Sequence, residues 1–241
     1  MNFSFYRNYE QGEYDGDGAA KPATAVQSGS LSDLRFARLV GKTAWFALPN
    51  AVRQRFSKRL KSGQSVVYKG RLIETRMSRM GWILAQLLRA IGGPLPLDTH
   101  DVGQEGAAVV TVTEAPGGRG QFWTRQYNRQ RGFPQVIHSM IQFSGPTGLE
   151  EGVGYGIGMT LTLKTEADSL LFCSAAYFVT LLGQRLYLPR WLTRCLMLGD
   201  LVIGHHDLGN GAFDFTLDLT HPLFGTLIHQ RARFFDMETA P

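Results

Sequence analysis

Aromatic and basic residues alternate in the middle of this 241-residue chain, in a pattern that could bind an anionic molecule. Trp123, Arg125 and Tyr127 are two residues apart, so all three point to one face if the segment is a β-strand. An Arg on the same face as aromatic rings can stack on them or hold an anionic head group. The alternative is an exposed strand face on which the stem of Arg125 covers an aromatic ring.

Carboxylates and one histidine could add acid–base chemistry to such a site. Glu150 and Glu151 are adjacent, and paired carboxylates can transfer protons when both face a cleft. Adjacent acidic residues at the start of a strand more often mark a turn. His138 lies on a neighbouring expected strand and could line the same pocket as Arg125.

No residue pattern predicts a catalytic or metal site. The six histidines include no His-Glu-x-x-His pattern, and no Gly-x-Ser-x-Gly segment occurs. His205 and His206 are neighbours on an expected strand, so they point to opposite faces and cannot jointly bind one metal ion. The sequence therefore predicts no catalytic residue, no metal ligand and no cofactor.

Residues 152–158 read Gly-Val-Gly-Tyr-Gly-Ile-Gly. In an extended strand, Gly152, Gly154, Gly156 and Gly158 would all fall on one face. Phosphate-binding glycine loops open a helix, whereas a strand pattern follows here, so a dinucleotide site is disfavoured. A glycine face lets another group approach the backbone, either a helix, which is the simpler occupant, or a flat ligand. If the occupant is a ligand, Gly154 and Gly156 are predicted to contact that ligand.

The net charge of +5 conceals an uneven distribution. Positions 34–97 hold 13 basic residues and one Glu, a charge of +12, so the rest of the chain carries −7 (5 − 12). Such a segment favours an anionic partner, and the alternative is a solvated helical face. Nucleic acid is less favoured because the basic residues lie mostly in expected helices, without a helix-turn-helix or zinc-finger pattern. The side chains predicted to contact an anionic membrane are Arg53, Arg55, Lys58, Arg59, Arg76, Arg79 and Arg89.

The composition is that of a folded protein without a disulfide framework. Hydrophobic residues make up 44% and charged residues 19%, which is enough apolar surface for a core. The two cysteines, Cys173 and Cys195, are interpreted as reduced packing residues. No uncharged stretch reaches the roughly 20 residues of a spanning helix. The interpretation is a cytoplasmic protein that can also lie peripherally at a membrane.

The hydrophobic patterns predict an α+β fold. Residues 1–30 read as a disordered tail and 31–241 as one domain, with a basic helical segment over 31–97 and a β segment over 98–241. Helices are expected near 31–40, 50–62, 78–91 and 190–198, and a strand over 65–75. About nine strands joined by short turns imply antiparallel pairing. The expected architecture is a strongly curved antiparallel sheet or open β-barrel with mostly N-terminal helices packed against it.

Several short motifs occur in a recognisable order. They are Trp123-x-Arg125-x-Tyr127, Ser139, Glu150-x-x-x-Gly154, Leu188-Pro189-x-Trp191-Leu192, and Phe213-x-Phe215 followed by His221-Pro222-Leu223-x-Gly225. Over about residues 47–235 the chain resembles the bacterial family named domain of unknown function 4166. The resemblance implies no activity and carries over no catalytic residue. The family often has a Glu before the Phe-x-Phe strand, where this chain has His205-His206-Asp207.

Three functions are compatible with these patterns. The leading hypothesis is a non-enzymatic binder of a hydrophobic or amphipathic, lipid-like small molecule, acting near an anionic membrane surface. The second is an enzyme for a small anionic substrate, with Arg125, His138 and Glu150 or Glu151 in one pocket. The third is a scaffold or regulatory module for a partner protein, which would present a large exposed apolar patch instead of a cavity.

Overall fold

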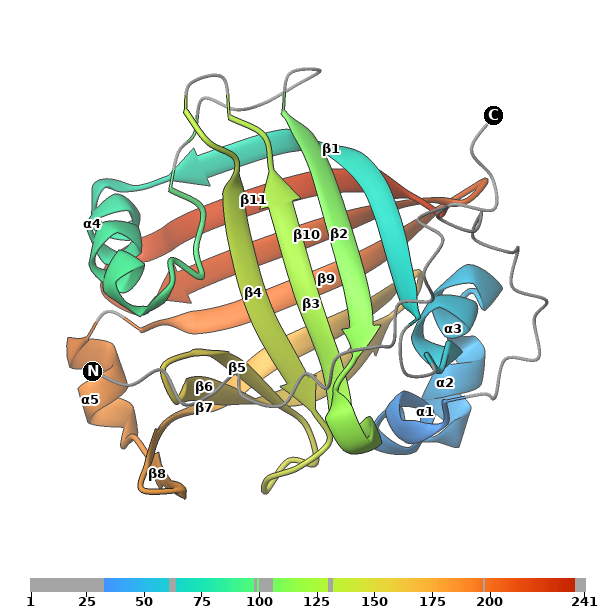
Figure 1. Cartoon of the computed structure of the whole chain (residues 1–241), viewed down its shortest axis with the longest axis horizontal. Coiled ribbons are helices and arrows are strands. Elements are labelled where there is room, and N and C mark those ends of the chain that lie inside the picture. Colours follow the sequence, from blue (N-terminus) through green and yellow to red (C-terminus); the bar gives the residue numbers. More distant parts are fainter. Residues whose placement is uncertain are drawn as a thin grey trace, which may run out of the picture.

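The structure is a computed structural model that describes residues 33–60, 64–97, 99, 106–129, 132–196 and 198–236. The tail expected over 1–30 lies outside these residues. Within them the chain forms a β-barrel with short helices at its two ends (Figure 1).

Ten antiparallel strands close the barrel in the described part of the chain. Their order around it is β6-β5-β4-β3-β2-β1-β11-β10-β9-β7, and pairing of β6 with β7 joins the two ends of the sheet. An eleventh strand, β8, pairs with the end of β7 and lies outside the barrel. The strands are β1 (Ser65–Met77), β2 (Ala107–Glu114), β3 (Gly120–Tyr127), β4 (Gln135–Gln142), β5 (Glu150–Gly154), β6 (Ile157–Glu166), β7 (Ser169–Leu181), β8 (Gln184–Tyr187), β9 (Asp200–Gly209), β10 (Ala212–His221) and β11 (Gly225–Phe235).

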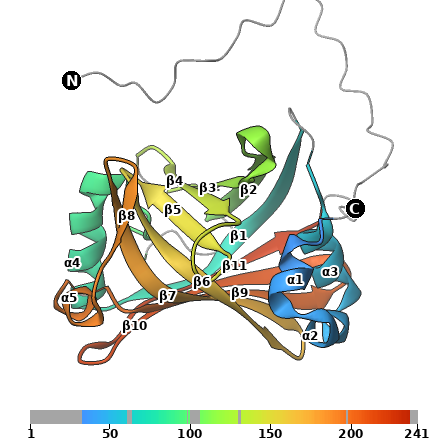
Figure 2. The same ribbon diagram turned by 90° about the horizontal axis from the view of Figure 1, so that it is seen from below.

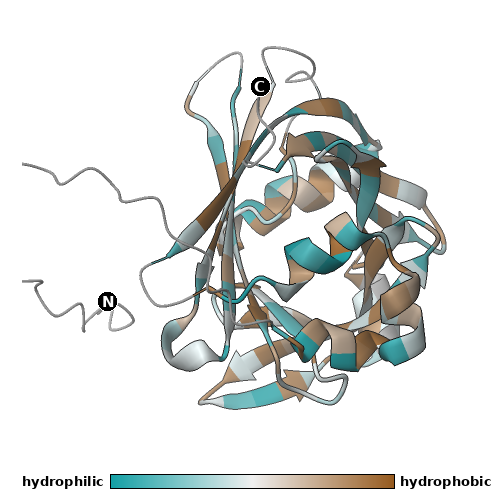
Figure 3. Ribbon diagram, turned by 90° about the vertical axis from the view of Figure 1, so that its right-hand side faces the viewer, coloured by the Kyte–Doolittle hydropathy of each residue, from teal (hydrophilic) through white to brown (hydrophobic). Residues whose placement is uncertain are grey.

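Alternating hydrophobicity explains why these segments form barrel strands. Hydrophobic and hydrophilic positions follow each other along many of the strand ribbons (Figure 3). In β3, Trp123, Arg125 and Tyr127 are buried, whereas Phe122 and Gln126 are exposed. Successive side chains of a strand point to opposite faces, so the first three enter the barrel and the other two lie outside. The expectation that the first three share a face is confirmed.

Short helices lie at both ends of the barrel (Figure 2). We call these the α3 end and the α4 end. The α3 end carries α1 (Arg35–Val40), α2 (Lys42–Ala47) and α3 (Asn50–Ser57). The α4 end carries α4 (Arg79–Leu88) and α5 (Arg190–Cys195), and the 3₁₀ turn η1 (Arg89–Ile91) continues α4. A second 3₁₀ turn, η2 (Pro116–Gly118), joins β2 to β3.

Helix α3 reaches the barrel core with one apolar face. Val52 and Phe56 are four residues apart on α3, and both are buried, as their spacing predicts. The helix expected over 50–62 ends at Ser57, so Leu60, which is also buried, follows the helix. The ring of Phe56 lies 5.5 Å from that of Phe172 on β7, and Phe36 on α1 lies 6.0 Å from the same ring. The α3 end of the barrel is therefore covered by aromatic side chains of its own helices.

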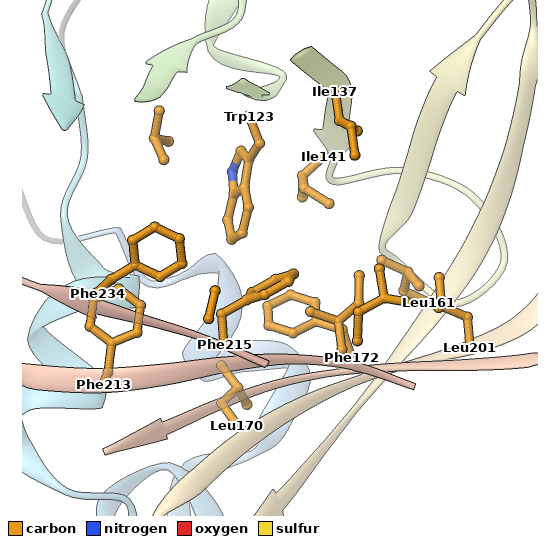
Figure 4. Packing of buried hydrophobic residues seen from close by; sticks show 14 of the residues in the cluster. Trp123, Ile137, Ile141, Leu161, Leu170, Phe172, Leu201, Phe213, Phe215 and Phe234 are labelled. Atoms are coloured by element: carbon orange, nitrogen blue, oxygen red, sulfur yellow. The ribbon is translucent and has the colours of Figure 1, made fainter. Parts of the chain in front are cut away.

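Side chains from opposite walls meet inside the barrel. Trp123, Ile137 and Ile141 project from β3 and β4 toward Phe172, Phe215 and Leu161 on the facing wall (Figure 4). The interior is thus a packed core along most of its length, which is what a small barrel needs for stability.

The expected α+β architecture, a strongly curved antiparallel sheet with mostly N-terminal helices packed against it, is confirmed, and the sheet closes into a barrel. The expectation for one glycine-rich segment is corrected. The glycine-rich segment is a β-hairpin and not one strand: Gly154, Tyr155 and Gly156 have φ of +124°, +50° and +77°. The expectation that its four glycines share one strand face was wrong, because alternate glycines suit a tight turn as well as a strand.

Candidate functional site

A small cavity lies inside the barrel near the α3 end. It measures about 40 Å³ and is lined by side chains of α1, α3 and strands β1, β2, β3, β9, β10 and β11. One water molecule needs about 10–15 Å³, so there is room for roughly three. Most of the lining is aromatic or aliphatic, and the polar side chains that reach it include Arg55, Gln121, Arg125 and His205.

His205 is surrounded by aromatic rings. It is 5% exposed and sits on β9 at an inward position, paired with Phe215 across β10. Five ring centroids lie 5.0–6.2 Å from the imidazole, those of Phe56, Trp123, Phe172, Phe213 and Phe215. Neither ring nitrogen has a hydrogen-bond partner among the described residues. A buried polar group without a partner is costly and requires an explanation.

The surroundings of His205 keep its imidazole neutral. Burial lowers its pKa well below 6.5, and the positive charges of Arg55, Arg125 and His206 lower it further. A neutral imidazole has one N–H donor and one acceptor nitrogen. His205 can therefore donate a hydrogen bond to an anion, or accept one from a donor, without adding a third positive charge.

Arg125 forms a buried ion pair across the barrel wall. Its Nη2 donates to Glu151 Oε1 on β5 and to Ser139 Oγ on β4, both at 3.3 Å. The guanidinium also lies 5.8 Å from the Trp123 ring and 5.6 Å from Phe215. Nε of Arg125 and the second oxygen of Glu151 have no partner among the described residues. The pair is thus neutralised but not saturated with hydrogen bonds.

Arg55 brings a second guanidinium to the cavity from α3. It is 8% exposed, stacks 3.7 Å above the Phe213 ring, and donates from Nη2 to Asp236 at 3.0 Å. Its Nε and Nη1 have no partner among the described residues. Arg55 therefore faces inward, although its place in a basic helix predicted contact with an anionic membrane.

These groups form a donor-rich site inside an apolar barrel. Two guanidiniums and a neutral imidazole converge on the cavity, and each has nitrogens without partners. Hydrogen bonds to charged groups contribute about 1.5–3 kcal/mol each, more than neutral ones. The arrangement can bind a small anion and, on the aromatic side, an apolar group attached to it.

The structure separates the residues proposed for acid–base chemistry. Glu151 faces inward to Arg125, whereas Glu150, its neighbour, donates no group to the cavity and instead accepts from Ser144 at 2.6 Å and pairs with Arg185 at 2.8 Å. His138 is on the outer face of β4, where it bonds Thr124 at 3.0 Å. Arg125, His138 and Glu150 therefore do not share a pocket.

The other predicted ligand residues lie apart from the cavity. Tyr127 is buried further along β3, where burial raises its pKa. Gly154 and Gly156 are in the hairpin at the α4 end. There a Cβ on Gly154 would lie 3.0 Å from the Ile91 carbonyl oxygen, so its close neighbour is the 3₁₀ turn after α4.

The predicted membrane-contact residues do not share a surface. The residues of α3 and its C-terminal extension, Arg53, Lys58 and Arg59, lie at the α3 end, and Lys58 reaches the cavity rim. Arg76, Arg79 and Arg89 flank α4 at the opposite end (Figure 2). The positive segment is thus divided between the two ends of the barrel.

Sequence reasoning assigned no role to His205. The sequence does contain a pattern that indicates its burial. Leu201, Ile203 and His205 are two residues apart on β9, so the imidazole lies on the same face of the strand as two apolar side chains. A polar residue on that face is buried. Its two Arg neighbours come from α3 and β3, and sequence alone does not bring those elements together.

In the part of the chain that the structure describes, no group of His, Cys, Asp and Glu side chains could hold a metal ion. Among the helices described, none has the length and hydropathy to span a bilayer.

Comparison with known proteins identifies the family. No curated protein sequence matches the chain. A solved structure from Thermobifida fusca YX, described as a putative thioesterase II, aligns with 73% of this chain and 80% of its own, at 8% identity and a TM-score of 0.23. The model of a family described as a domain of unknown function, DUF4166, matches residues 48–234. The chain belongs to the DUF4166 family.

Proposed function

We propose that this protein binds a small amphipathic anion inside its barrel and does not catalyse a reaction on it. A carboxylate, or a similar head group, would lie between Arg55, Arg125 and His205, and the apolar part would lie among the aromatic rings. The observation that carries the proposal is His205, a fully enclosed imidazole with neither nitrogen partnered by a described residue.

The cavity volume limits the size of the ligand. About 40 Å³ accommodates a molecule of few heavy atoms, whereas pockets for drug-sized ligands measure about 300–1,000 Å³. A long acyl chain would need Phe36 and Phe56 to leave the barrel with α1 and α3. Short carboxylic acids are therefore the first ligands to consider, and a lipid-like acid is a longer member of the same class.

Electrostatics favour an anionic over a neutral ligand. Arg55 and Arg125 each have one carboxylate partner within 3.3 Å and further nitrogens without described partners. In a low-dielectric interior, an added carboxylate accepts charge-assisted hydrogen bonds, which are stronger than those of an amide of equal size.

An enzyme acting on a small anionic substrate is the second candidate. It is supported by the contact of Arg125 with Glu151 at 3.3 Å beside a neutral imidazole, because a carboxylate and an imidazole can both transfer protons. The residues first considered for it are dispersed, since His138 and Glu150 lie outside the cavity. Binding without turnover needs fewer groups and is the function we propose.

The test is a calorimetric titration with acetate, butanoate and octanoate, each compared with its neutral amide. Saturable binding of a carboxylate, with the matching amide weaker by about tenfold or more, is the expected result. Equal binding of acid and amide would contradict the anionic head group. No saturable binding of any acid in the series would contradict the function.

Two variants and a control locate the site. Arg125→Met combined with Glu151→Leu removes both charges of the pair, which avoids leaving one buried alone, and should weaken butanoate binding by about tenfold or more. Arg55→Met should act in the same direction. Arg59→Gln removes an exposed charge at the same end and should leave binding unchanged. A loss in the control equal to that in the paired variant would place the anion at the surface.

A further inference from the structure

Exposed apolar side chains are concentrated on the turns and helices of the α4 end. Six of them are 54–95% exposed. We call this set the apolar rim: Trp82 and Leu87 on α4, Tyr155 between β5 and β6, Leu182 between β7 and β8, Trp191 on α5, and Leu223 between β10 and β11. Large exposed apolar groups that gather on one side of a protein mark an interaction surface.

Backbone contacts hold the elements of the apolar rim side by side. Helix α4 packs on the start of β11 through Gly81, where a Cβ would lie 2.0 Å from the Leu227 oxygen. Gly199, after α5, packs equally closely on Thr220 before the β10–β11 turn. The β5–β6 turn meets the β7–β8 hairpin through the bond from Thr180 N–H to the Gly156 oxygen, at 2.6 Å. Figures 1 and 2 show α4, α5 and β8 on the same side of the barrel.

Helix α4 carries apolar side chains on its outer side as well as on its buried side. Gly81, Leu84 and Ala85 are buried on the side that faces β11. Trp82 and Leu87 lie on the outer side with Arg79. A helix with an aromatic and aliphatic outer face and flanking Arg residues can lie in the head-group region of a bilayer.

Positive charge accompanies the apolar rim around α4. Arg79 is exposed and forms no ion pair with any described residue, and Arg89 bonds only to Gln86 among them. Arg76 is 77% exposed and pairs with Glu74. Carboxylates also lie at this end: Asp218 pairs with His229 near the start of α4, and Asp200 is exposed. Arg79 and Arg89 are two basic side chains here that pair with no described carboxylate.

We infer that the apolar rim docks the protein on an anionic phospholipid surface. The six side chains belong to five separate turns and helices, and a fluid interface accepts separated side chains without matching their shape. A protein partner would require one continuous complementary patch. Trp and Leu side chains would enter the head-group region while Arg79 and Arg89 contact lipid phosphates. This inference uses no residue of the interior cavity, so its failure and that of the proposed function are separable.

The test is flotation with phosphatidylcholine vesicles that contain or lack phosphatidylglycerol, at low and high salt. The wild-type chain should float with the anionic vesicles at low salt and less at high salt. Arg79→Gln and Arg89→Gln should each weaken partitioning about fivefold. Trp82→Ser combined with Leu87→Ser should weaken it by more than about tenfold.

Matched variants keep the inference falsifiable. Phe46→Ser removes an apolar side chain that is 60% exposed on α2 at the opposite end, and should leave partitioning unchanged. Leu182→Ser alters only the tip of a turn, where the side chain is 95% exposed, and should weaken partitioning without affecting the thermal melt. Absence of flotation, or equal losses in the Phe46 and Leu182 variants, would overturn the inference. A dimer by light scattering that Trp82→Ser/Leu87→Ser dissociates would also overturn it, because the rim would then bind a second copy.

Discussion

Replacing His205 by Phe should stabilise the protein. Two ring nitrogens without described partners cost about 1–3 kcal/mol each, and the substitution removes both. The larger ring costs about 1–3 kcal/mol in overpacking, which the adjacent cavity of about 40 Å³ reduces. At the middle of each range, about 4 kcal/mol is regained and about 2 kcal/mol is lost, so the net gain at neutral pH is about 2 kcal/mol. This direction is unusual, because most substitutions of buried residues are destabilising.

The gain should increase as the pH falls. Burial, together with the charges of Arg55, Arg125 and His206, lowers the pKa of His205 well below 6.5 in the folded state; Glu151 neutralises part of the charge of Arg125. Below pH 6.5 the unfolded chain binds a proton at this residue and the folded chain does not, so the wild type loses stability. For each pH unit below 6.5 at which folded His205 stays neutral, the difference in the free energy of unfolding between variant and wild type increases by about 1.4 kcal/mol.

Urea denaturation at neutral pH and at about one unit below the ordinary histidine pKa measures both effects. A gain of 1 kcal/mol corresponds to a rise of about 2–4 °C in Tm for a chain of this size. His138→Phe is the control, since it replaces an exposed imidazole on the outer face of β4. The reasoning is refuted if His205→Phe is destabilising at neutral pH, or if its free energy of unfolding changes with pH as that of the wild type does.

Two pairs of substitutions test the packing of the barrel. Glu151→Gln should destabilise the fold by about 3–5 kcal/mol, because it leaves the guanidinium of Arg125 buried without a counter-charge. Glu150→Gln should lower the free energy of unfolding by less than Glu151→Gln does, because its partner Arg185 is 34% exposed. Urea denaturation measures both variants, and equal losses would contradict the interpretation of Arg125–Glu151 as a buried ion pair. Gly156→Ala should destabilise more than Gly183→Ala: both have a φ close to +77°, but the added Cβ would lie 2.9 Å from the Thr180 oxygen in the first and within 4 Å of nothing in the second. Thermal melts compare the two glycine variants, and equal shifts in Tm would show that the β5–β6 hairpin does not pack closely on β7.

Local patterns predict much of this fold. Alternation along β3 places Trp123 and Arg125 on one face, and the four-residue spacing of Val52 and Phe56 gives α3 its buried side. Asn210-Gly211 predicts the β9–β10 hairpin, where Asn210 has a φ of +52°. Each of these features depends on residues close together in the chain.

Closure of the barrel depends on contacts that no local pattern encodes. Pairing of β1 with β11 joins Lys69 to Phe235, and pairing of β6 with β7 completes the ring. The short α2 was not predicted, because six residues with one buried Trp45 give no helical period. Arg55 was predicted to face outward because it lies in a basic helix. It is adjacent to Phe56 on α3, and both side chains are buried.

The interior site shows the same limit. Sequence spacing pairs Trp123 with Arg125, but Glu151, Arg55 and His205 come from β5, α3 and β9, and they meet because the barrel closes. Arg125 was expected beside His138 and one of the two carboxylates Glu150 and Glu151. It contacts Ser139 instead of His138, and of the two carboxylates it contacts Glu151. A shift of one residue in a strand changes the face, so only one of two neighbouring side chains faces the barrel interior.

The most direct test of an anion site inside the barrel is nitrogen-15 NMR of the histidine side chains during a titration with butanoate. We predict that the His205 signals show a neutral imidazole in the free protein and shift saturably as butanoate binds, while those of exposed His138 stay unchanged. Butanamide should produce no such shift. If butanoate leaves His205 unaltered, or moves His138 and His205 alike, the cavity does not bind the anion and the central claim is contradicted.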